Sequence, residues 1–538
     1  MTPRPRRDRS RESAGVGGIA HSVTRGSFYL ALEKAAALFS GVAYFALLLR
    51  WLGPTKYGIM TLALSFTGLA TMATGNFEVF LERYAAEYEA HGTLATLRRA
   101  HALALGLKLG LGLIATLAIV ALAPLLAGQF NTPGLATLLP MLALMVAFDG
   151  FSTTGRATLY GLQRFRWVSG IAILFHVAKT VMVGLLWYTL QGLPQLAVGL
   201  TALTLAQGFA FTVLPLWLLR RAQDPPAAPP PPRRALLRSM MGYSVPLLGA
   251  RVTFLSGQNF GKIVLGKLFD TTQLGYFSFA IQTIERFVEL AYTVPSALLP
   301  SLTQLVARGE RVRLDAVFDR AQRLISVLAC ALSFGLFVYA RELTLLVGSH
   351  LFEPAIPMVR VLALVPAART AQQPLTMLFQ AMRRPGTVLR LALLKFATEF
   401  GSYFALLPVL RIAGAAWANL AGAVVSYVAA LALAARLLPG GAPGRAAVAL
   451  RCGLLLVALL LAGWVAELRL PHAVSLAFRI ALAPVAVVSV FALGLVTEDD
   501  LETLADVPLR WAPLRALRDP VVGVAGRLAR ALAPRGGL

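Results

Sequence analysis

Apolar stretches of about twenty residues alternate with short polar segments along almost the whole chain. At a helical rise of about 1.5 Å per residue, such a stretch crosses a hydrocarbon layer about 30 Å thick. The pattern therefore predicts an all-α, polytopic membrane protein with about fourteen transmembrane helices. The predicted spans are residues 26–49, 57–80, 101–127, 135–160, 167–190, 194–219, 241–266, 274–299, 322–347, 355–381, 387–410, 412–435, 446–467 and 473–496.

Arginine and lysine are concentrated in every second connection between these spans. One set of connections holds clusters of arginine, including those in residues 1–25, 221–238 and 497–538. The opposite set holds only Arg50, Lys56, Lys267, Arg341, Arg411 and Arg469. Because basic connections stay in the cytoplasm, we expect both termini and the linker 221–238 to be cytoplasmic. Arginine far outnumbers lysine and alanine is abundant, which is typical of a GC-rich bacterial genome, so we expect the bacterial inner (cell) membrane. The first span is expected to remain as an anchor, since no small-residue cleavage site follows it.

Composition agrees with this prediction and excludes other classes. Of the 538 residues, 57% are hydrophobic and 14% are charged, and the mean hydropathy is +0.69. A soluble domain usually has about 25% charged residues. The net charge of +25 lies mostly in the connections, so it indicates orientation and not nucleic-acid binding. Cys330 and Cys452 lie in apolar stretches and give no disulfide framework.

The chain also lacks the usual sequence signals for a metal or a nucleotide. The six histidines show no metal-binding spacing. The segment "GQNFGKI" from Gly257 has three residues between its glycines, where a phosphate loop has four, and Ile263 stands where that loop has Ser or Thr. We therefore expect no metal and no cofactor.

Two halves of the chain resemble each other. A shift of 217 residues aligns "LLLRWLGPTKYGIMTLA" (47–63) with "VLGKLFDTTQLGYFSFA" (264–280). Chance similarity between apolar segments is the alternative. The aligned stretches contain two short periplasmic turns, "WLGPTKYG" (51–58) and "LFDTTQLG" (268–275), called the tips below. The tips are expected either to separate during transport or to be ordinary turns beside an interfacial cation. The predicted parts are a basic N-terminus (1–25), an N-lobe of six helices (26–220), a Pro-rich linker (221–238), a pseudo-symmetric C-lobe of six helices (239–437), two further helices (438–496) and a cytoplasmic tail (497–538).

Polar residues lie on one face of several predicted spans. Each charged residue that faces lipid at the centre of a span costs about 2.5–3.5 kcal/mol, so these faces are expected to line an aqueous cavity. The candidate cationic residues for binding an anionic substrate are Arg251, Lys262, Arg286 and Lys34. The candidate polar residues of the cavity are Gln258, Asn259, Gln282, Arg369, Gln373 and Arg156. Glu285 and Glu289 are the candidates for coupling transport to a proton or Na⁺.

Structural alternatives stay open for the charged residues. Arg286 can pair with Glu285 or Glu289 inside a packed bundle. Arg251 and Lys262 can extend to the two membrane interfaces, and Lys34 can lie among lipid head groups.

Two further charged positions have structural interpretations. Lys395 and Glu399, at i and i+4, predict an ion pair on one helix. Glu78 ends the second predicted span and is expected to be solvated.

The stretch from Arg25 to Arg99, with "LLLRWLGPTKYGIMTLALSFTGLA" and "LERYAAEYEAHG", resembles the N-terminal signature of polysaccharide-biosynthesis flippases. These are the O-antigen and exopolysaccharide exporters of the multidrug/oligosaccharidyl-lipid/polysaccharide (MOP) superfamily. The most specific element is Arg-x-Leu-Gly-Pro-x-x-Tyr-Gly, from Arg50 to Gly58. The resemblance extends more weakly to "LFQAMRRPG" in the tenth span.

The resemblance implies two six-helix lobes around a cationic cavity and a flippase that moves polyprenyl-diphosphate-linked oligosaccharide to the periplasmic leaflet. The expected partners are this lipid-linked substrate, the bilayer and a polysaccharide polymerase or export machinery, without nucleic acid. We expect a transporter and not an enzyme. The alternatives are a multidrug or cation antiporter of the same superfamily, and a membrane sugar polymerase or ligase. The longest periplasmic segment, "RELTLLVGSHLFEPA", is short for such an enzyme.

Overall fold

The computed structural model describes residues 9–221, 231–292, 295, 298–438, 442–496 and 500, and all regular elements within these ranges are helices. Eleven helical segments of the described residues are long and apolar enough to cross a membrane. The predicted all-α membrane architecture is confirmed. The predicted number of fourteen is approximate. One of the eleven segments, Phe28–Ala73, covers the first two predicted spans, and the polar helices at the seventh and eighth predicted spans are not among the eleven.

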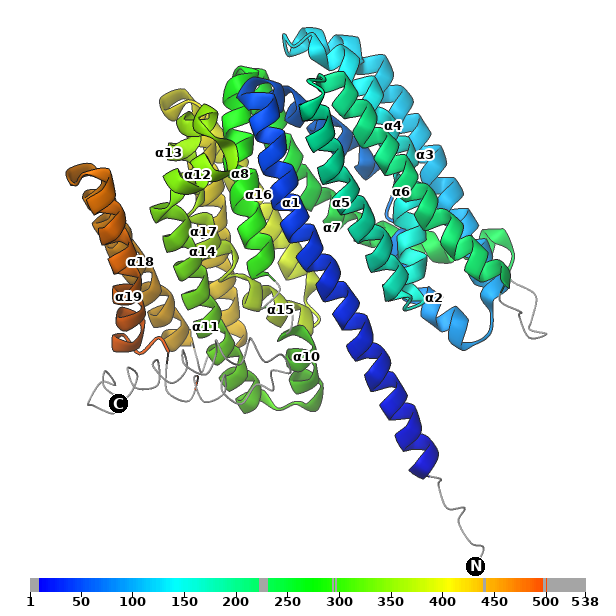
Figure 1. The fold of residues 1–538 in the computed structure, drawn as a ribbon. Helices are drawn as coiled ribbons and strands as arrows, with labels where there is room; N and C mark the ends of the chain where they lie inside the picture. The colour runs from blue at the N-terminus through cyan, green and yellow to red at the C-terminus, as the bar shows by residue number, and fades with distance from the viewer. Residues whose placement is uncertain are drawn as a thin grey trace, which may run out of the picture. The chain divides into compact units, whose positions relative to one another are not determined.

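The chain divides into two compact units, Met1–Gly275 (unit 1) and Tyr276–Leu538 (unit 2). The helices of unit 1 are α1 (Arg9–Ala73), α2 (Glu78–Ala90), α3 (Leu94–Gln129), α4 (Gly134–Gly161), α5 (Phe165–Tyr188), α6 (Leu193–Arg221) and α7 (Arg233–Leu268). Helix α8 (Thr271–Ala291) begins in unit 1 and continues into unit 2. Within unit 1, α4 packs closely against both α3 and α6 (Figure 1).

Unit 2 continues with shorter helices and ends in two long ones. They are α10 (Leu298–Arg308), α11 (Arg311–Val338), α12 (Ala340–Gly348), the 3₁₀-helix η1 (His350–Ala355), α13 (Ile356–Leu362), α14 (Val365–Arg369), α15 (Gln373–Ala381), α16 (Pro385–Leu410), α17 (Ala413–Leu437), α18 (Ala442–Arg469) and α19 (His472–Ala492). Helices α18 and α19 lie side by side (Figure 1). They cover most of the thirteenth and fourteenth predicted spans, 446–467 and 473–496.

Helix α1 contains the first predicted tip as a sharp kink. Gly53 has φ 64° and ψ 177°, a conformation that is accessible essentially only to glycine. Pro54 follows it and suits the first turn of the next helical segment, where its missing N–H costs no hydrogen bond. The second span is shorter than predicted, since α1 ends at Ala73 and a separate helix begins at Glu78.

The tenth predicted span, 355–381, is three short helices instead of one. Pro357, Pro366 and Pro374 lie in the first turns of α13, α14 and α15. Because proline cannot donate the backbone hydrogen bond that continues a helix, each of them favours a new start.

Close packing of the helices depends on small residues and buried ion pairs. A Cβ on Gly155 of α4 would lie 2.0 Å from the carbonyl oxygen of Phe211 in α6, so only glycine allows this approach.

In unit 2, α18 and α19 pack against α11 through an apolar cluster that includes Phe334 and Leu482. The end of the described chain is held to α11, where Arg320 and Arg323 bind the buried carboxylate of Asp500 at 2.6 and 2.7 Å.

Candidate functional site

Lys108 of α3 is the centre of a buried ion network in unit 1. Its ammonium donates to Glu78 Oε2 of α2 at 2.9 Å and to Thr153 Oγ1 of α4 at 2.8 Å, and it lies 3.3 Å from Asp149 Oδ2. The Lys108 side chain is fully buried, whereas those of Glu78 and Asp149 are 10% and 26% exposed. The three protons of the ammonium thus face three acceptors.

The expectation that Glu78 is solvated is wrong. The early end of α1 at Ala73 and the left-handed Gly75 (φ 83°) start a new helix, whose first residue, Glu78, is buried against α3. Lys108 is not among the residues selected from the sequence, although a lysine inside a strongly apolar span is itself a signal for a functional or paired charge.

A second buried carboxylate in unit 1 is Glu33 of α1. Arg156 Nη2 of α4 donates to Glu33 Oε1 at 2.7 Å, and Ser169 Oγ of α5 donates to Oε2 at 3.1 Å. The Arg156 side chain remains 48% exposed, and the neighbouring Lys34 is exposed. Two cations selected from the sequence are therefore accessible in unit 1.

In unit 2, Glu285 of α8 forms an ion pair with Arg369 of α14. Arg286 is 44% exposed and pairs with the exposed Glu289 on its own helix, at 3.3 Å. This geometry is the pairing that the sequence left open for Arg286, and it separates the roles of the two glutamates. Glu285 connects α8 to α14 through its ion pair, whereas Glu289 is exposed.

The predicted ion pair of α16 is confirmed. Lys395 Nζ lies 3.4 Å from Glu399 Oε2, and Asn419 of α17 donates to Glu399 Oε1 at 2.8 Å. The pair is therefore part of the contact between α16 and α17.

The remaining candidates lie on α7, α8 and α15. Lys262, Asn259, Gln282 and Gln373 are partly buried. A Cβ on Gly68 of α1 would lie 3.0 Å from Asn259 Oδ1, so α1 and α7 approach closely there. The candidates Arg251 and Gln258 lie outside the residues whose side chains the structure describes.

The two predicted tips are in contact with each other. Thr55 and Thr272 are related by the shift of 217 residues, and their Oγ1 atoms lie 2.8 Å apart. Both residues belong to the aligned stretches of the two halves. Equivalent positions of the two halves therefore meet.

Backbone contacts around the threonines follow the same symmetry. A Cβ on Gly58 would lie 1.8 Å from Thr271 O, and a Cβ on Gly275 would lie 2.0 Å from Pro54 O. The shift maps Gly58 to Gly275 and Pro54 to Thr271, so the two contacts are reciprocal. Such reciprocity is typical of an internal two-fold repeat and is hard to reconcile with chance similarity.

The cation of the second tip has a structural role. Lys267 donates to the carbonyl oxygen of Gln129 at the C-terminus of α3, and its ammonium lies 5.8 Å from the centre of the Phe130 ring. A cation is favourable there because the carbonyl end of a helix carries partial negative charge.

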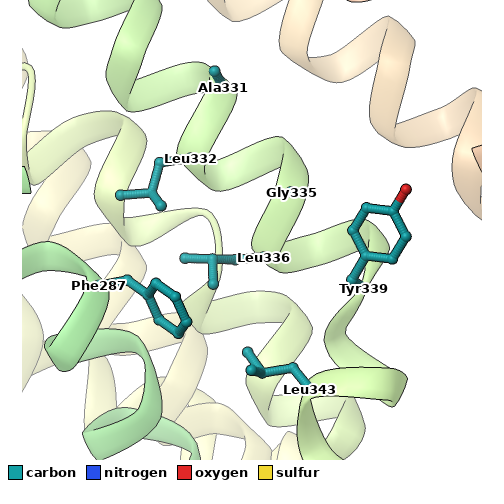
Figure 2. A pocket seen from close by; sticks show the side chains of 7 residues that line it. All are labelled: Phe287, Ala331, Leu332, Gly335, Leu336, Tyr339 and Leu343. Atoms are coloured by element: carbon teal, nitrogen blue, oxygen red, sulfur yellow. The ribbon is translucent and has the colours of Figure 1, made fainter. Parts of the chain in front are cut away.

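An apolar pocket of about 310 Å³ lies in unit 2 between α8, α11 and α12. Figure 2 shows Phe287 of α8 opposite Leu332 and Leu336 of α11, and Gly335 leaves space between its neighbours. The pocket offers almost no polar groups, so it suits a hydrocarbon chain and not a sugar or a diphosphate.

Comparisons with known proteins agree with this arrangement. The sequence model of the family described as "Polysaccharide biosynthesis protein" matches residues 47–357, more than half of the chain. No functionally curated protein matches the sequence.

Solved structures that are similar to the chain include two with TM-scores near 0.6. One is an inward-facing multidrug resistance MATE family transporter of the MOP superfamily, with a TM-score of 0.59 and 14% identity over 77% of this chain and 95% of that chain. The other is the lipid II flippase MurJ in an inward closed conformation, with a TM-score of 0.60 and 13% identity over 86% and 97%. At these identities the similarity shows the fold.

Proposed function

Because the chain belongs to the polysaccharide biosynthesis protein family, we propose that it is a flippase of the MOP superfamily and translocates a polyprenyl-diphosphate-linked oligosaccharide. The movement runs from the cytoplasmic to the periplasmic leaflet of the bacterial inner membrane, by alternating access. The single observation that carries the proposal is the family match over residues 47–357. The oligosaccharide is then a polysaccharide repeat unit that a polymerase or export machinery receives in the periplasm.

Accessible cations support an anionic substrate. Lys34 is exposed, and the Arg286–Glu289 pair is also exposed, which makes that pair weak and exchangeable. A diphosphate would offer Arg286 charge-assisted, bidentate hydrogen bonds in place of the single carboxylate contact. On the basis of the sequence pattern, we assign Arg251 and Lys262 to the same set of substrate-binding cations. In this proposal they draw the diphosphate away from lipid.

The contact between the two tips supplies a reversible closure in this proposal. Its polar part is the hydroxyl pair of Thr55 and Thr272, which water can replace in the open state. Separation of the tips would open the path to the periplasm, and their contact would close it.

Translocation can be tested in vesicles that contain the purified full-length protein. The probe is an undecaprenyl-diphosphate-linked disaccharide with a fluorophore on the sugar, and its arrival in the opposite leaflet is read by a membrane-impermeant quencher. We expect transport by the wild type and at least about a tenfold loss in Lys34→Ala/Arg286→Ala, since removal of two charge-assisted contacts costs more than 1.4 kcal/mol. Arg308→Ala removes an exposed cation of α10 and is the matched control.

One result would contradict this function, and another would contradict the assignment of its binding residues. Export of a fluorescent cationic drug without movement of the lipid probe would instead support the multidrug antiporter. Equal transport by the double variant and by the control would remove Lys34 and Arg286 from substrate binding.

A further inference from the structure

The apolar pocket of unit 2 lies beside a cation of the proposed substrate site. Phe287 of α8 forms one wall of the pocket, and Arg286 is the residue directly before it. Neighbouring Cα atoms are about 3.8 Å apart, and neighbouring residues of a helix point about 100° apart. The pocket and the cation thus occupy adjacent faces of one helical turn.

The shape of the pocket suits part of a hydrocarbon chain. Its volume is about 310 Å³, and apolar side chains of α8, α11 and α12 line it. Gly335 of α11 creates part of the space, because a Cβ at this position would meet nothing within 4 Å. Ala331 is exposed, so the pocket opens to the surface of the unit. Figure 2 shows the Tyr339 hydroxyl directed away from Leu336, which leaves hydrocarbon surface inside.

An apolar lining alone does not select one chain from a bilayer. Lipid tails are as apolar as leucine, so a chain gains little when it leaves the bilayer for an apolar pocket. Selection therefore requires a polar group that is attached to the chain and binds the protein. Arg286 can bind such a group when it is an anion, because its side chain is 44% exposed and its ion pair with Glu289 is also exposed.

Charged residues elsewhere on the three helices are paired or lie away from the α8 wall of the pocket. The ion pairs are Glu285 with Arg369 and Glu342 with Arg479. The charged residues of α11 end at Arg323, eight residues before the pocket lining of that helix begins. Arg341 of α12 is exposed, in a connection that the arginine distribution places in the periplasm. At the α8 wall, an anion would therefore bind Arg286.

The depth of Arg286 favours a translocated lipid over a resident phospholipid. It lies at the middle of the predicted span 274–299, about 18 Å along the helix from the start of that span. The phosphate of a bilayer phospholipid stays in the head-group layer, and glycerol separates it from the acyl chains. In a polyprenyl diphosphate, the first isoprene unit is bonded directly to the diphosphate. A diphosphate on Arg286 would therefore place this unit beside Phe287.

We propose that this pocket binds the first isoprene units of the polyprenyl chain while Arg286 binds the attached diphosphate. The identity of the lipid rests on the proposed function. The two contacts act together in this site. The diphosphate replaces Glu289 on Arg286 and supplies the affinity, and the pocket accepts a chain that is bonded directly to the anion.

Photocrosslinking tests the site without transport. The probe is undecaprenyl diphosphate with a diazirine in its first isoprene units, added to the full-length protein in lipid vesicles, and mass spectrometry locates the label. We expect the label on residues 331–343 of the wild type, and at least about tenfold less of it in Gly335→Leu, whose side chain would occupy the pocket. Gly401→Leu of α16 is the matched control, because a Cβ there also meets nothing within 4 Å.

Head group and chain can be separated in the same assay. Unlabelled undecaprenyl diphosphate should compete with the probe, whereas undecaprenol, which has the chain without the diphosphate, should not. Arg286→Ala should reduce labelling at least about tenfold, since a charge-assisted contact is lost. Arg341→Ala removes an exposed cation two residues from Tyr339 and should keep the label. The competition needs no variant, so it decides the proposal even if Gly335→Leu does not fold.

Equal labelling of Gly335→Leu and Gly401→Leu would overturn the chain site. Competition by undecaprenol would also overturn it, as would equal labelling of this segment by a phosphatidylglycerol with a diazirine in its acyl chain, which would indicate a general lipid contact. If labelling behaves as expected and the fluorescent lipid-linked disaccharide is not moved, the chain site stands and the proposed function fails. If that lipid is moved and Gly335→Leu labels like the wild type, the proposed function stands and the chain site fails.

Discussion

Single glycines decide whether the two tips can meet. A Cβ at Gly58 or Gly275 would lie 1.8 or 2.0 Å from a backbone carbonyl oxygen, and backbone cannot move aside as a flexible side chain can. We therefore predict that Gly58→Ala and Gly275→Ala shift the protein away from the state in which the tips touch. Disulfide formation between Thr55→Cys and Thr272→Cys, in a background without the two native cysteines, should slow at least about tenfold, a cost of 1.4 kcal/mol or more.

Gly41 provides the control for this experiment. It lies in α1, and a Cβ there would meet nothing within 4 Å. Gly41→Ala should leave the crosslinking rate unchanged and stabilise the helix by about 0.5–1 kcal/mol. If Gly58→Ala crosslinks as fast as Gly41→Ala, close approach of the tips does not depend on glycine.

Sequence reasoning at this scale found contacts within a helix better than contacts between helices. The Lys395–Glu399 pair follows from i, i+4 spacing, and the structure contains it. The partners of Lys108 on α3 come from two other helices, α2 and α4, and no spacing rule connects them. Glu78 was misjudged for the same reason, because its burial depends on where α1 ends.

At the scale of elements, a buried arginine fixes α19 to the rest of unit 2. Arg479 is fully buried and donates to the carbonyl oxygen of Val338 at 2.6 Å and to Glu342 Oε1 of α12 at 2.7 Å. Nothing in the apolar pattern of the last span points to these partners. Helix α19 therefore depends on a charge at a position where the pattern predicts packing against lipid or apolar side chains.

We predict that Arg479→Ala lowers the free energy of unfolding by about 3–5 kcal/mol, because it breaks a buried pair and leaves two acceptors without a donor. Thermal unfolding of the detergent-solubilised protein measures this as a fall in Tm. Arg451→Ala on α18 removes an exposed arginine with one long hydrogen bond, to Leu493 O at 3.3 Å, and should cost less than about 0.5 kcal/mol. Equal values of Tm for the two variants would show that Arg479 does not hold α19.

Element boundaries show why apolar length predicted spans but not helices. Hydropathy averages over a window and does not register that Gly53 kinks α1 or that Pro357, Pro366 and Pro374 divide the tenth span. Conversely, α7 and α8 are long helices that hydropathy alone would reject, because their polar faces lower the average. The alternation of basic and neutral connections supports both spans, since it is read from positions outside the apolar stretches.

At the scale of the whole molecule, the distribution of arginine predicts one orientation in the membrane. The connections assigned to the cytoplasm carry nearly all of the excess positive charge, and translocation of such clusters across the inner membrane is unfavourable. The exposed Lys56 at the first tip and the exposed Arg308 at the end of α10 lie on opposite sides in this prediction. Neither is part of a buried network, so a cysteine at either place should leave the fold unchanged.

Thiol labelling measures this orientation directly. In intact spheroplasts, a membrane-impermeant maleimide should label Lys56→Cys and not Arg308→Cys, and permeabilisation should make Arg308→Cys reactive as well. The opposite labelling pattern would show that the protein has the inverted orientation in the membrane. The contact between the tips would then lie on the cytoplasmic side of the membrane.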